Sequence, residues 1–242
     1  MTTQSGHSRR QFLLAGTATG TGLVTAALVG NIKAGETTAP AKSGSQPGED
    51  ISPPEDLMRE HGVLNRILLV YEECLRRLHG HETLDTSVVV GAAKIVRTFI
   101  EDYHEKQEEE FVFPRFEKAG KLVDLVTTLR QQHQAGRRLT EQITKLAIPA
   151  VVNDAEGSRE LARAISRFSR IYRPHEARED TVLFPALRTV VTAKEFDEMG
   201  DRFEDREHQL FGQHGFEGIV DQVAELEKKL SIYDLSQFTP KT

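Results

Sequence analysis

Two copies of one short string carry the residues best suited to bind a metal. The string HEKQEEEFVFP at residues 104–114 recurs as HEAREDTVLFP at residues 175–185. His, Glu, Glu, Phe and Pro keep the same offsets in both copies. A histidine and a glutamate four positions apart lie on one face of an α-helix, about 40° apart around its axis. Each copy therefore offers an imidazole nitrogen and a carboxylate that point the same way, which is half of a metal site.

The elements that must position these residues are helices. Beyond residue 54 almost every segment follows a hydrophobic period of about 3.6 residues, and the alternation typical of strands is missing. We expect long helices at about 55–78, 87–119, 121–146 and 158–191, then a capping box at 192–195, a fifth helix to about Gly212 and a short helix at 216–230. Four long helices joined by short loops predict an all-α, up-down-up-down antiparallel four-helix bundle with additional C-terminal helices.

This topology also predicts which residues share a level. In an antiparallel pair of helices, two residues lie at one height when they are equally far from the connecting turn. Counted in this way, one histidine from each long helix falls on a common layer inside the bundle, where an unpaired polar group is costly. With the glutamates of the repeated string, the inward candidate ligands are His61, His104, Glu108, His133, His175 and Glu179.

Six such ligands suit two metal ions. Imidazole nitrogens mixed with carboxylate oxygens favour iron, with manganese or zinc as alternatives, and each glutamate can bridge two cations. Each ion would keep positions open for water, dioxygen, peroxide or nitric oxide. A single His-x-x-x-Glu pair is more often a solvated ion pair. Two copies, together with His61 and His133 at matching height, favour the metal interpretation instead.

Some further polar residues have less certain positions. His208 is a seventh candidate ligand, because it lies as far beyond the turn near residue 192 as His175 lies before it; capping a helix is its alternative role. Asp180 is expected to point away from the layer unless the region around Pro174 is distorted, since five positions correspond to about 140°. Glu105 and Glu109 are interpreted as surface charges or as hydrogen-bond partners of the ligands. Packing, or hydrogen bonding near the metals, is expected of Tyr71, Tyr103 and Tyr172.

The N-terminal region is typical of an export signal. The string SRRQFL at residues 8–13 precedes an apolar stretch rich in Gly, Ala and Thr, and this pattern predicts a twin-arginine signal. We therefore expect the chain to use the twin-arginine export machinery and to have a periplasmic or other extracytoplasmic location. An uncleaved signal would leave a membrane tether. The expected organisation is a signal region at 1–41, a flexible linker at 42–54, the bundle at 55–191 and a C-terminal helical extension packed on it at 192–242.

Composition restricts the possible functions. Hydrophobic residues make up 38 % and charged residues 28 % of the chain, as in a soluble globular protein. The net charge of −6 argues against nucleic acid as a partner. Cys74 is the single cysteine, so the chain can form neither an intramolecular disulfide nor a thiolate metal cluster, and packing is its expected role.

Residues 55–190 resemble the hemerythrin-like, HHE cation-binding family. The resemblance is carried by the Glu60–His61 pair, by His133, and by the two His-x-x-x-Glu strings that end in Phe-Pro. It implies a four-helix bundle around a non-heme di-iron centre. Bacterial members are associated with oxygen binding or sensing, with iron handling, and with responses to nitric oxide or peroxide.

The chain departs from the oxygen-carrying members in one respect. Those have a second histidine four residues after the one on the third helix, where this chain has Arg137. They also use an aspartate at the spacing of Asp180, whereas iron-sensing and iron-repair branches use the glutamate at the position of Glu179. Arg137 is expected to form a surface salt bridge or to lie beside a bound anion. The departure argues against reversible dioxygen carriage and favours oxidation chemistry or iron storage and donation.

The resulting hypothesis is an exported di-iron protein that binds, senses or reacts with dioxygen, peroxide or nitric oxide. Three alternatives remain: a di-iron peroxidase or catalase-like enzyme, an iron store or donor, and a metal-free helical scaffold.

Overall fold

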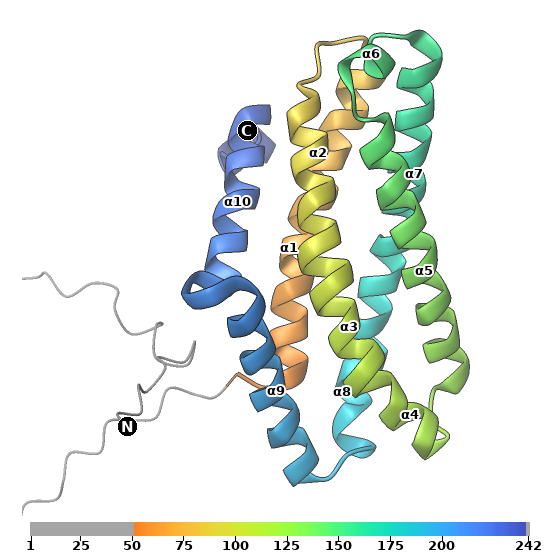
Figure 1. The fold of residues 1–242 in the computed structure, drawn as a ribbon, viewed down its shortest axis with the longest axis vertical. Coiled ribbons are helices and arrows are strands. Elements are labelled where there is room, and N and C mark those ends of the chain that lie inside the picture. Colours follow the sequence, from red (N-terminus) through yellow and green to blue (C-terminus); the bar gives the residue numbers. More distant parts are fainter. Residues whose placement is uncertain (1–50, 241–242) are drawn as a thin grey trace, which may run out of the picture. The chain divides into compact units, whose positions relative to one another are not determined.

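The computed structural model describes residues 51–240, which are helical and contain no strand. Four long helical stretches, here called rods one to four, form an up-down-up-down antiparallel bundle (Figure 1). The export signal expected at 1–41 and most of the linker lie outside the described residues. None of the helices between residues 51 and 240 combines the length and the apolar character that a membrane span requires.

The rods are built from these elements. Rod one is α1 (Pro53–His79) and rod three is α5 (Val123–Leu146). Rod two comprises α2 (Thr86–Ile95), η2 (Val96–His104), α3 (Glu105–Gln107), η3 (Glu108–Val112) and α4 (Phe113–Ala119). Rod four comprises α7 (Ala155–Arg178), η4 (Glu179–Leu183), α8 (Phe184–Ala186) and η5 (Leu187–Thr189). The remaining elements are α6 (Pro149–Val152), α9 (Ala193–Phe211), η6 (Gly212–His214), α10 (Gly215–Leu230) and η7 (Leu235–Phe238).

Local sequence signals explain where the rods begin and end. Pro53 opens rod one, with acidic residues in the first turn where they oppose the helix dipole. Gly120 ends rod two in the left-handed conformation at φ 63°, which glycine adopts without steric cost. Asp154 accepts two backbone N–H groups at the start of α7. Thr192 and Glu195 form the expected capping box of α9.

The rods pack in a ring in which α1 contacts α2 and α7, while α5 contacts α2 and α7. The C-terminal helices lie along one side of this ring: α10 packs on α1 and α2, and α9 packs on α1 (Figure 1).

Rods two and four depart from regular α-helix, and two of these departures are at equivalent places. The segments η2, η3 and η4 are π-helical, with wider turns than an α-helix. Segments η3 and η4 begin at Glu108 and Glu179 and end directly before the repeated Phe-Pro. Proline lacks the N–H that would continue the hydrogen-bond ladder, and its ring crowds the preceding turn, which accounts for a widened turn at this place. The phenylalanines pack as expected, since Phe113 and Phe184 are buried.

The interior contains two apolar clusters with a polar layer between them. One cluster includes Leu64, Phe99 and Phe168, and the other includes Phe113 and Phe184. Along every rod the histidines and glutamates of the candidate site fall between the residues of the two clusters. The apolar packing above and below therefore fixes the height of the polar layer.

Candidate metal centre

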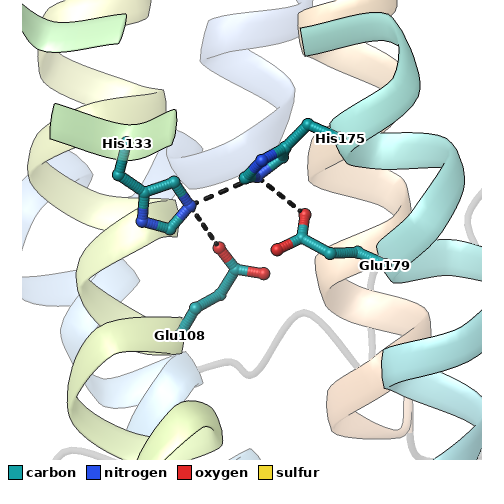
Figure 2. Close-up of side chains that lie close together, drawn as sticks. All are labelled: Glu108, His133, His175 and Glu179. Carbon is teal, nitrogen blue, oxygen red and sulfur yellow. Dashed lines mark hydrogen bonds and ion pairs between the residues drawn. The ribbon is translucent and has the colours of Figure 1, made fainter. Parts of the chain in front are cut away.

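The polar layer brings the six expected inward ligands together. They come from all four rods, and each is at most 3 % exposed. Their atoms form two overlapping groups with metal-ligand spacing: Glu108 with His133, His175 and Glu179, and Glu108 with His61 and His104. Figure 2 shows the first group, in which two imidazoles and two carboxylates from rods two, three and four point toward one another.

The four histidines face each other as two pairs. Nε2 of His61 lies 3.1 Å from Nε2 of His104, and Nε2 of His133 lies 3.2 Å from Nε2 of His175. Two nitrogen ligands at about 2.1 Å from one cation, and at right angles to each other, are about 3.0 Å apart. Each pair therefore fits two adjacent positions on a single cation.

The two glutamates connect the histidine pairs. Oε2 of Glu108 lies 3.4 Å from Nε2 of His133 and 3.7 Å from Nε2 of His104. Oε2 of Glu179 lies 3.0 Å from Nε2 of His175 and 3.4 Å from Nε2 of His61. Each carboxylate thus touches one histidine of each pair, which is the arrangement that a bridging ligand requires.

The same carboxylates lack hydrogen-bond donors. Neither oxygen of Glu108 nor either oxygen of Glu179 accepts a hydrogen bond, although both side chains are fully buried. A buried carboxylate that accepts no hydrogen bond costs several kcal/mol. Cations between the four rods would remove this cost, so the donor set fits two metal ions.

Carboxylates outside the layer orient the first pair of histidines. Nδ1 of His61 hydrogen-bonds to Asp180 at 2.7 Å, and Nδ1 of His104 hydrogen-bonds to Glu60 at 2.7 Å. A hydrogen bond at Nδ1 fixes the ring and leaves Nε2 free to face a metal. Gln107 donates to Glu60 at 3.3 Å and holds that carboxylate in place.

The second pair is held in the same way but by different groups. Nδ1 of His133 lies 3.1 Å from Oε1 of Glu109, and Nδ1 of His175 lies 2.9 Å from the side-chain oxygen of Gln132. Arg137 extends this network, because its Nη2 contacts Glu105 at 2.7 Å and Glu109 at 2.9 Å. The structure thus places Arg137 in a partly buried ion-pair network next to His133.

Charges within the layer shift proton affinities in opposite directions. Burial, the negative charge of Glu179 and other nearby acids raise the pKa of Glu108 well above its ordinary value. Burial also opposes ionisation of Glu179, but His175 and His61 outweigh it and lower the pKa of Glu179. Burial lowers the pKa of His61, yet the hydrogen bond to Asp180 and the nearby carboxylate of Glu179 outweigh burial and raise it to about 10. The layer thus concentrates negative charge that only cations or protons can balance.

The structure corrects two positions expected from the sequence. Asp180 does not point away from the layer but contacts His61, because the π-helical turn of η4 rotates it by less per residue than an α-helix would. His208 does not join the site: it is exposed on α9, while the preceding Glu207 is the buried residue. Equal height along neighbouring helices does not fix the direction in which a side chain points.

Two hydrogen-bond partners of the ligands were not expected as such. Glu60 and Gln132 each directly precede a ligand histidine, at about 100° around the helix, so each faces the adjacent rod. Their adjacency to His61 and His133 was the available sequence signal. The sequence could not show that they contact His104 and His175 on other rods.

Comparison with known proteins agrees with this geometry. The sequence profile described as the hemerythrin HHE cation binding domain matches residues 52–151, which include four of the six inward ligands. Similar proteins of Mycobacterium tuberculosis and Mycobacterium bovis, both described as uncharacterized, are 52 % identical over 190 residues, covering 78 % of this chain and 74 % of each relative. No solved structure matches the chain significantly. The chain therefore belongs to the hemerythrin HHE cation-binding domain family.

Proposed function

We propose that this chain is an exported non-heme di-iron protein whose metal pair binds, senses or reacts with dioxygen, peroxide or nitric oxide. The observation that carries the proposal is the donor set itself. Two pairs of facing Nε2 atoms are joined by two buried glutamates whose oxygens accept no hydrogen bond. Such a set holds two cations and leaves further positions on each of them free for an external ligand.

Burial limits the external ligand to a small molecule. The six ligand side chains are nearly inaccessible, and the apolar clusters cover the layer from both ends of the bundle. A diatomic gas or peroxide fits such a site, whereas a larger organic substrate does not. When bound, the metal ions would supply the electrons for reducing dioxygen or peroxide. The protein residues would hold the ions and exclude bulk water.

The surrounding carboxylates favour oxidised iron. Besides the two ligand glutamates, Glu60, Glu109 and Asp180 each face the outer nitrogen of a ligand histidine. Negative charge next to a histidine increases its electron donation to the metal, which stabilises the higher oxidation state. This charge supports chemistry in which iron is oxidised, rather than reversible carriage of dioxygen.

Metal content and spectra of protein purified without oxygen test the proposal. We expect two irons per chain and an optical band that appears with dioxygen, peroxide or nitric oxide. A band that reverses when oxygen is removed would identify a carrier, rapid peroxide consumption would identify an enzyme, and transfer of iron to an apo-acceptor would identify a donor. If the purified protein holds manganese or zinc in place of iron, the proposed identity of the metal is wrong.

Variants make the test specific. His104→Ala and His175→Ala each remove one nitrogen from a different histidine pair, and both are expected to lower the metal content of the purified protein. His208→Ala is the matched control, because His208 is exposed and lies outside the layer. Metal content that is unchanged in both layer variants would refute the proposed site.

Export requires a separate experiment. The proposal rests on the SRRQFL string at residues 8–13. A fusion of residues 1–54 to a reporter that functions only outside the cytoplasm should be active, and replacement of Arg9 and Arg10 by lysine should abolish that activity. Equal activity of the two fusions would contradict the twin-arginine route.

A further inference from the structure

Three tyrosines are buried in the bundle, and their hydroxyl groups differ in environment. Tyr71, Tyr103 and Tyr172 are each at most 1 % exposed. The hydroxyl of Tyr71 has no hydrogen-bond partner. The hydroxyl of Tyr103 donates to Glu207 on α9 at 3.3 Å. The hydroxyl of Tyr172 donates to Oε1 of Glu105 at 2.6 Å, which is a short hydrogen bond to a carboxylate.

Tyr172 also contacts the candidate metal site. It lies on α7 three residues before His175, and the edge-to-face contact of the two rings has a centroid distance of 5.5 Å. The chain leaves space for its hydroxyl at Gly136 on the facing rod, where a Cβ atom would overlap the phenol oxygen. Packing alone would be satisfied by phenylalanine, so the position accommodates a hydroxyl group specifically.

Glu105 is well placed to accept the phenol proton. The carboxylate is 1 % exposed, and its second oxygen forms the ion pair with Arg137 at 2.7 Å. This ion pair holds the carboxylate in place, so that its other oxygen faces the phenol of Tyr172. The oxygen that pairs with Arg137 lies 4.0 Å from Nδ1 of His133, so the acceptor adjoins the layer as well. Of the three tyrosines, Tyr172 alone combines a ring contact to a ligand histidine with a short hydrogen bond to a buried carboxylate.

We propose that Tyr172 donates one electron to the oxidised metal pair and that Glu105 takes its proton. This inference rests on the proposed function. Peroxide would be the oxidant: with two protons and two electrons supplied by the bound irons it would become two molecules of water, and Tyr172 would return one of those electrons. The O–H bond of Tyr172 then breaks, the proton forms an O–H bond with Oε1 of Glu105, and the electron reduces the metal pair by one. The product is a neutral phenoxyl radical, which can be reduced again by an external one-electron donor.

Electron paramagnetic resonance tests this step directly. Full-length, iron-loaded protein would be mixed with hydrogen peroxide and frozen within a second. We expect an organic radical signal that narrows when the protein carries ring-deuterated tyrosine. Tyr172→Phe should reduce the signal at least tenfold while the iron content and the melting temperature of the protein stay close to wild type. Tyr71→Phe is the matched control and should retain the signal.

A second variant tests the proton acceptor. Glu105→Gln retains a hydrogen-bonding group of the same size but removes the base, so the radical yield should fall several-fold at unchanged iron content. A full signal in Tyr172→Phe would overturn the assignment, as would the absence of any organic radical in protein that holds two irons and consumes peroxide. Protein that binds no iron would overturn the proposed function as well, so the two failures are distinguishable.

Discussion

Replacement of Glu108 by glutamine is expected to separate stability from metal binding. In protein treated with a chelator, both oxygens of Glu108 are buried without a donor, and its carboxylate faces that of Glu179. Glutamine is uncharged and its amide can donate to the carboxylate of Glu179, and supplying one such missing hydrogen bond is worth about 1 to 3 kcal/mol. For a chain of this size, each kcal/mol shifts the melting temperature by about 2 to 4 °C. The chelated variant should therefore melt at a higher temperature than the chelated wild type.

The gain in stability from Glu108→Gln should increase as the pH rises. Burial, Glu179 and other nearby acids raise the pKa of Glu108 in the folded state, so the folded chain binds more protons than the unfolded chain above the ordinary pKa of glutamate. Stability of the chelated wild type is then lost as the pH rises above about 4.3. The advantage of Glu108→Gln should accordingly increase with pH over the same range.

With iron bound, the wild type should be more stable than Glu108→Gln, the reverse of their order in chelator. Saturation of the wild-type site at 100 times its dissociation constant adds about 2.7 kcal/mol. The variant lacks a bridging carboxylate and should gain much less. Glu110→Gln serves as the control on the same rod, because Glu110 is exposed and pairs with Arg206 at the surface; its effect should stay within about 0.5 kcal/mol. Thermal unfolding followed by circular dichroism, with chelator and with iron, measures the stability of the wild type and of both variants. A chelated Glu108→Gln that melts below the chelated wild type would refute the reasoning.

Three further predictions concern the residues around the layer. Cys74 is fully buried, and burial raises the pKa of its thiol to about 12. A maleimide at pH 8 should therefore leave Cys74 unmodified in the native protein and react with it completely after denaturation. Rapid labelling of the native protein would contradict this prediction. Gly136→Ala should lower the free energy of unfolding by about 1 to 3 kcal/mol in denaturant titrations, because a Cβ atom at this position would overlap the hydroxyl of Tyr172. Adding Tyr172→Phe should restore part of that loss in the double variant. If the effects of the two substitutions simply add, the packing explanation is wrong. Arg137→Met removes the cation that pairs with the buried Glu105 and should lower the free energy of unfolding by about 2 kcal/mol. This is less than the loss of a fully buried ion pair would cost, because Arg137 is partly exposed. An unchanged denaturation midpoint would show that the ion pair contributes nothing to stability.

The height of the site could be predicted from the sequence because helix rise is constant. Distances counted from the turns place His61, His104, His133 and His175 on one level, and the structure brings their side chains together. The helical fold class followed from the hydrophobic period in the same way. Both results depend on regular geometry that a local sequence pattern determines.

The direction of some side chains could not be predicted, for two physical reasons. Asp180 was misplaced because a rotation of 100° per residue does not hold through the π-helical turn before Pro185. The count from the turn near residue 192 gives His208 the same height as His175, but its side chain is exposed in the structure. The partners Glu60 and Gln132 depend on how neighbouring rods are rotated, which only the packed bundle determines.

The most direct measurement of the central claim is anomalous X-ray diffraction from crystals of the iron-loaded protein, recorded on both sides of the iron absorption edge. The account predicts two anomalous peaks within the layer. One should lie beside Nε2 of His61 and His104, and the other beside Nε2 of His133 and His175, with Glu108 and Glu179 next to both. An empty layer, or iron bound only at the protein surface, would contradict the account.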